Sequence, residues 1–181
     1  AAGAAGAGVF SKPATGNFYP VSPDFNGIPV KSKLPLVQRI NELCFSKSPQ
    51  VVKVSAGFSN AVKRTLVVSS DGVMAHDLIP SGYLSASVVA EKDGRREQSG
   101  WNLGGRRDFS FYTDEVVDKI ATRAVSNALT LFEANQPPAG AIPVVLGPGI
   151  TGILLHEAIG HGMEADFNRK NTSTYSTMLG K

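Results

Sequence analysis

The sequence has little cysteine and no long apolar run. Its single cysteine, Cys44, cannot form an internal disulfide, which excludes a disulfide-stabilised scaffold and fits a reducing compartment. No apolar run approaches the roughly 18 residues that a membrane-spanning helix needs. No basic region followed by an apolar core suggests secretion. We therefore expect a cytoplasmic location and no membrane partner.

An excess of charge of one sign is also missing. The chain of 181 residues carries 18 Lys and Arg against 15 Asp and Glu, a formal net charge of +3. Its two adjacent arginine pairs, at 95–96 and 106–107, are each followed by an acidic residue. Without a dense basic run, nucleic acid is not an expected partner. A hydrophobic content of 42% is ample for one packed domain.

Three regions are expected along the chain. Residues 1–32 combine an alanine and glycine stretch with several prolines, which predicts a low-complexity, extended segment. Residues 33–136 should form an α+β scaffold, and residues 137–181 the start of a catalytic region. The two prolines in the run from Gln136 to Gly140 mark the boundary between them.

The scaffold is predicted to contain two helices that cover an antiparallel β-meander. Apolar residues at helical spacing predict the first helix over residues 33–46, with Ser32 as its N-cap. A continuous apolar stripe between Val117 and Phe132 predicts the second helix, with Thr113 as its N-cap. This second helix should cover one face of the meander.

The meander is predicted to have four or five strands. Short β-branched runs before and after Ser59-Asn60 are interpreted as separate strands, and Asp71-Gly72 and Lys92-Asp93-Gly94 as turns. A Gly-Gly-Arg segment follows at residues 104–106, next to several aromatic residues. It could let a substrate approach closely, but a loop or bulge whose aromatics pack on the sheet is the preferred interpretation.

A strand, a glycine turn and a helix are predicted after the boundary. Ile142 to Leu146 has the composition of a buried strand, Gly147 to Gly149 that of a tight turn, and the helix should begin near Ile150. The same order occurs in phosphate-binding loops. Because no Gly-Lys-Ser/Thr sequence closes the turn, nucleotide binding is not expected.

The stretch that carries chemistry is HEAIGH, from His156 to His161. Two imidazoles that bracket a carboxylate can present a metal ion and a general base together. The common zincin motif places its histidines at i and i+4, whereas these lie at i and i+5. At about 100° per residue, five steps rotate the second imidazole about 140° from the first. We therefore expect either a π-type turn or unwinding at Gly160 to bring the two together.

Glu157 is the predicted general base of this motif. It lies next to the first histidine, where it would take a proton from a metal-activated water and pass it to the leaving amine. The structural alternative is that His156 and His161 are ordinary polar residues of a helix. We favour the metal site, because two of only three histidines flank a glutamate inside an apolar segment.

The region from Ile142 to Lys181 resembles the metal-motif region of the TldD/PmbA family of zinc metallopeptidases. The resemblance is carried by the HExxxH motif and by GMEADFNR, Gly162 to Arg169, which continues in the family's register. It implies the TldD-type, catalytic subunit, with His156 and His161 as zinc ligands and Glu157 as catalytic base. It also implies extended or unfolded peptides as substrates and a heterodimer with a PmbA-type partner.

The resemblance leaves the third metal ligand open. In that family it is a cysteine well downstream of the motif, so we expect it beyond Lys181. Cys44 lies upstream in a predicted amphipathic helix and is interpreted as a small buried apolar residue. Glu164, three residues after His161, is the alternative ligand within the chain, ahead of Asp166 and His76.

Full-length members of the family are more than twice this long. We therefore expect residues 1–181 to be an internal fragment that is inactive by itself. Two other functions stay open: a non-catalytic assembly or interaction module that holds no metal, and a metalloenzyme that acts on something other than peptides.

Overall fold

The computed structural model describes residues 25–178 and Gly180. They belong to two compact units, which divide between Asn135 and Gln136. Most of the low-complexity and proline-rich segment expected over residues 1–32 lies outside the described residues. Among the helices of the described part, none is both long and apolar enough to cross a bilayer.

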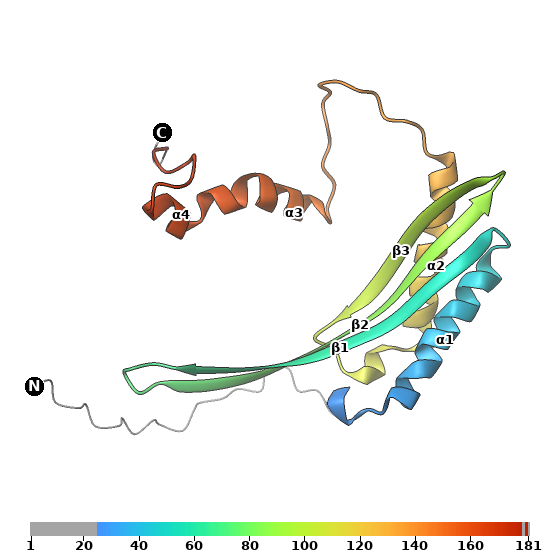
Figure 1. The fold of residues 1–181 in the computed structure, drawn as a ribbon, viewed down its shortest axis with the longest axis horizontal. Helices are drawn as coiled ribbons and strands as arrows, with labels where there is room; N and C mark the ends of the chain where they lie inside the picture. Colours follow the sequence, from blue (N-terminus) through green and yellow to red (C-terminus); the bar gives the residue numbers. More distant parts are fainter. Residues whose placement is uncertain (1–24, 179, 181) are drawn as a thin grey trace, which may run out of the picture. The chain divides into compact units, whose positions relative to one another are not determined.

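The first unit is built on a three-stranded antiparallel sheet in the order β1-β2-β3 (Figure 1). The strands are β1 (Val51–Val68), β2 (Met74–Lys92) and β3 (Arg95–Gly105). With its covering helices, the sheet confirms the predicted α+β class.

The predicted strand number is wrong, because the described residues form three strands rather than four or five. Ser59 and Asn60 do not end a strand; they pair with Tyr83 and Gly82 of β2 inside one continuous ladder. A polar side chain does not interrupt a strand whose backbone hydrogen bonds continue on both sides.

Both hairpin turns are confirmed. Asp93 and Gly94 have positive φ angles of 52° and 78°, as a two-residue type I′ turn between twisted strands requires. Gly72 has a φ of 89°, and the amide of Ser69 donates to the carbonyl of Val73 at 2.9 Å to close the first hairpin.

Helices α1 (Val30–Lys47) and α2 (Asp114–Thr130) lie on the same side of the sheet (Figure 1). Helix α2 begins as predicted, with Thr113 Oγ1 accepting a hydrogen bond from the amide of Val116. Helix α1 begins earlier than predicted, because Pro29 is its N-cap residue. Ser32 is therefore not an N-cap, since its amide already donates to the Pro29 carbonyl at 3.0 Å.

The core of this unit lies between the helices and one face of β2. Every second residue of β2 from Leu84 to Ala90 is buried, as the two-residue period of a strand requires. Small and large apolar side chains from both surfaces fill this core. The buried positions of α2 are those of the predicted apolar stripe: Val117, Ile120, Ala121, Ala124, Val125 and Ala128.

Aromatic rings close one end of this core. The ring of Phe58 packs edge-on against Tyr112 at 4.9 Å and against Phe109 at 5.9 Å between centroids. The interpretation that the aromatics after the Gly-Gly-Arg segment pack on the sheet is thereby confirmed. Burial raises the pKa of Tyr112 to about 12.

Ile142 to Leu146 is not buried, contrary to expectation. Val145 is 97% exposed and Val144 69%, and among the described residues no strand pairs with this segment. Without a neighbouring strand, the backbone N–H and C=O groups of an apolar run have no strand partners for hydrogen bonds and stay exposed to solvent. The bend at Pro148-Gly149 and the helix after it follow in the predicted order.

We predict that Gly104→Ala destabilises the first unit. A Cβ at this position would overlap the carbonyl oxygen of Gly82, a backbone atom that cannot move aside without shifting β2. The free energy of unfolding should fall by about 1–3 kcal/mol, which urea denaturation measures. Gly57→Ala is the control, since its Cβ would meet only Ser85 Oγ at 3.7 Å. Equal stability of the two variants would contradict the prediction.

Candidate metal centre

The motif lies on a helical segment whose hydrogen-bond pattern changes twice. It begins as α3 (Thr151–Leu155), continues as a π-helix over His156–Gly160 and tightens to a 3₁₀ turn over His161–Met163. The amide of His161 donates to the carbonyl of His156, the i to i+5 bond that defines a π turn. Of the two distortions predicted for this spacing, the π-type turn is confirmed.

Gly160 leaves room for this turn. A Cβ on Gly160 would lie 3.1 Å from Nδ1 of His156, closer than ordinary van der Waals contact. The imidazole of His156 therefore occupies space that any larger residue at position 160 would contest. The glycine matters here for its missing side chain rather than for an unusual φ angle.

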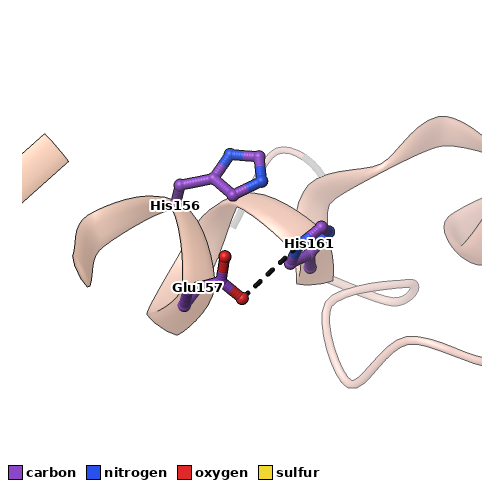
Figure 2. Close-up of side chains that lie close together, drawn as sticks. All are labelled: His156, Glu157 and His161. Atoms are coloured by element: carbon purple, nitrogen blue, oxygen red, sulfur yellow. Dashed lines mark ion pairs between the residues drawn. The ribbon is translucent and has the colours of Figure 1, made fainter. Parts of the chain in front are cut away.

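The π turn places His156, Glu157 and His161 on one side of the helix (Figure 2). The two imidazole centroids are 4.4 Å apart with their planes at 70°. Glu157 Oε2 is 3.5 Å from Nε2 of His161. One ligand atom from each of the three residues lies within 4.8 Å of the others, and all three side chains are exposed. Within the described part of the chain, no other group of His, Cys, Asp and Glu meets this criterion.

Glu164 contacts His161 from the other side of the ring. Its Oε1 is 2.5 Å from Nδ1 of His161, and this hydrogen bond raises the pKa of His161 above its ordinary value. The negative charge of Glu157 raises the same pKa further. The structure therefore brings Glu164 to His161 but not into the cluster of three.

The other candidate ligands lie elsewhere. Cys44 is fully buried in α1 of the first unit, where burial raises its pKa to about 11. His76 lies on β2 of the same unit, and Asp166 lies on the short helix α4 (Ala165–Arg169) after the motif. The interpretation of Cys44 as a buried apolar residue agrees with its place in the core.

The chain after the motif folds back onto it, an arrangement that sequence reasoning missed. Asn168 Nδ2 and Ser173 Oγ both donate to the carbonyl of Gly162, at 2.9 and 2.5 Å. The ring of Tyr175 packs so close to Gly162 that a Cβ on this glycine would overlap the ring. The polar composition of this segment signals hydrogen bonding but not its partner, because the contacts join residues up to 13 positions apart, across a short helix and irregular chain.

The donor set fits a transition-metal ion. Zinc takes imidazole nitrogen and carboxylate oxygen, and a catalytic site leaves one position for water or substrate. Imidazole suits copper, iron and nickel as well, so the two histidines favour this class of metal without selecting one member. The site defines a candidate metal-dependent hydrolase centre, with a carboxylate next to two imidazoles.

Comparison with known proteins assigns the family. A model of the PmbA/TldA metallopeptidase central domain matches residues 23–132, more than half of the chain. The chain belongs to this metallopeptidase family. The matched region is the first unit, so this comparison does not itself cover the metal motif.

Curated relatives extend the similarity to the second unit. A metalloprotease TldD homolog of Buchnera aphidicola is 38% identical over 86% of this chain and 34% of its own length. The Haemophilus influenzae TldD homolog is 39% identical over 83% of this chain and 32% of its own length. A metalloprotease of Synechocystis is 30% identical over 93% of this chain and 35% of its own length. This match is longer than the first unit, so it includes part of the second. The chain thus spans about a third of the length of the relatives it matches.

A solved structure shows the same fold. The chain matches a crystal structure from Thermotoga maritima, named for a suggested modulation of a DNA gyrase, with a TM-score of 0.54. Sequence identity is 22%, over 66% of this chain and 27% of that one. This likeness supports the fold alone.

We predict that the thiol of Cys44 is unreactive in the native protein. Its pKa of about 11 leaves almost no thiolate at pH 8, and the core shields the sulfur from reagents. A thiol-reactive dye should label Cys44 slowly in buffer and rapidly in 6 M guanidinium, followed by absorbance. Fast labelling of the native protein would contradict the assignment of Cys44 to the core.

Proposed function

We propose that the protein is the catalytic chain of a zinc-dependent peptidase. The observation that carries this proposal is the π turn, which sets two imidazoles and a glutamate side by side at the HExxxH motif. Membership of a metallopeptidase family and relatives named metalloproteases support the reaction class. Zinc is favoured over other metals by the family, since the donor set suits several.

Each residue of the cluster has a separate task. His156 and His161 would hold the zinc ion, which when bound supplies Lewis-acid polarisation of the scissile carbonyl and of water. Glu157 would take a proton from the attacking water and deliver it to the nitrogen of the leaving amine. Its position next to the first ligand, 3.5 Å from the second, suits this transfer. Its exposed carboxylate is accessible to a substrate.

The remainder of the site is part of the proposal. A third protein ligand would come from outside residues 1–181, because the described residues bring no third imidazole or thiolate to the cluster. We also propose extended or unfolded peptides as substrates and a PmbA-type subunit as partner in a heterodimer, as the resemblance of the motif region implies. A cytoplasmic location stays a prediction from the single cysteine.

Glu157→Gln should abolish peptide cleavage without loss of zinc. Glutamine keeps the size of the side chain but cannot accept the proton, so kcat should fall by about 10²–10⁴-fold. The measurement is hydrolysis of a library of unstructured peptides by the full-length protein with its partner subunit, with zinc content determined in parallel.

Glu115→Gln, which changes a carboxylate in the first turn of α2, is the matched control. Unchanged cleavage by Glu157→Gln would rule out the proposed base. A wild-type protein that holds zinc but cleaves no peptide in the library would favour a metalloenzyme with another substrate. A wild-type protein that holds no zinc would favour the non-catalytic assembly module.

Gly160→Ala should weaken zinc binding by about tenfold, a loss typical of a disturbed ligand environment. The added methyl group would press on Nδ1 of His156 and displace its ring. Competition with a chelator measures the affinity. Gly152→Ala, on α3 with nothing within 4 Å of its Cβ, should bind zinc as the wild type does. Equal affinities in both variants would show that the space at Gly160 is not needed.

A further inference from the structure

Glu164 stands at the point where the motif leaves helical geometry. Its backbone, with φ of −59° and ψ of 134°, ends the 3₁₀ turn and precedes α4. Glutamate is not a favoured residue at a helix N-cap, and this side chain makes no capping hydrogen bond to α4. The carboxylate therefore does not cap α4 and is free to contact another group.

That contact is with His161, and the backbone reinforces it. The amide of Glu164 donates to the carbonyl of His161 at 3.3 Å, while Oε1 lies 2.5 Å from Nδ1 of the ring. One residue thus holds both the main chain and the imidazole of His161. The side chain of Glu164 is 41% exposed and that of His161 51%, so the contact is partly shielded from water.

The two nitrogens of His161 face different groups. Nδ1 lies against Glu164, whereas Nε2 lies 3.5 Å from Oε2 of Glu157, another member of the cluster. In a neutral imidazole, a carboxylate that accepts from one nitrogen fixes the proton there and leaves the other free as a ligand. The contact with Glu164 thus selects the nitrogen that faces the cluster.

We propose that Glu164 is a positioning residue for His161: it accepts the hydrogen bond from Nδ1–H and so presents Nε2 to the metal. This inference rests on the proposed function. It replaces the alternative that Glu164 is itself the third ligand. A carboxylate that is hydrogen-bonded to Nδ1 is not available to a metal ion bound at Nε2. Arrangements of this kind orient the ring and raise the basicity of the ligand.

The test compares Glu164→Gln and Glu164→Ala with the wild type in the full-length protein. Glutamine keeps an acceptor oxygen but loses the charge, and alanine loses both. Zinc affinity, measured by chelator competition, should fall about tenfold in the first variant and further in the second. Asp166→Asn is the matched control, since it removes a carboxylate of the same segment that pairs with neither histidine.

A second readout needs no metal. In the zinc-free protein, ¹⁵N chemical shifts of histidine at a pH where the ring is neutral should place the proton of His161 on Nδ1. Glu164→Ala should lose this preference. An unchanged melting temperature of the variant would show that the loss does not come from unfolding.

The possible failures are distinguishable. If the wild type binds zinc and both variants match its affinity, the positioning role is overturned and the proposed function stands. If X-ray absorption of zinc-loaded Glu164→Gln shows one oxygen ligand fewer than the wild type, Glu164 is a ligand and the positioning role is also overturned. A wild type that binds no zinc overturns the proposed function, and this inference with it.

Discussion

The candidate metal centre depends on one backbone hydrogen bond, from the amide of His161 to the carbonyl of His156. In a regular α-helix the two imidazoles would point about 140° apart, and no rotamer change would correct this. The π turn adds one residue to the turn and brings them together, with 4.4 Å between ring centroids. Gly160 permits it by leaving space for the ring of His156. Isolated π turns are often associated with functional sites, and here the geometric reason is explicit.

The two units divide scaffold from chemistry. The first unit carries the family's central domain, and its histidine and cysteine belong to a sheet and a core rather than to a ligand cluster. Its core forms where the alternating buried residues of β2 meet the apolar stripe of α2. The second unit holds its motif through local hydrogen bonds, including those that return to Gly162.

The predictions that failed are those that depend on which strand or helix lies beside a segment. The strand count was wrong because Ser59 and Asn60 were read as a break, whereas β2 continues to pair with them. The prediction that Ile142 to Leu146 is a buried strand was wrong. An apolar run becomes a buried strand only where another strand or helix covers it. Local signals succeeded where the cause is local: the positive φ angles at Asp93-Gly94 and the Thr113 cap need only adjacent residues.

The amino-acid sequence alone was enough to predict the motif, its i and i+5 spacing and the need for a distorted turn. These follow from covalent geometry and helix periodicity, which require no knowledge of distant residues. Two features could not be predicted from it and are shown by the structure: the distortion is a π turn, and Glu164 contacts Nδ1 of His161. Those outcomes depend on backbone direction at single residues, such as the ψ of 134° at Glu164, which spacing alone does not fix.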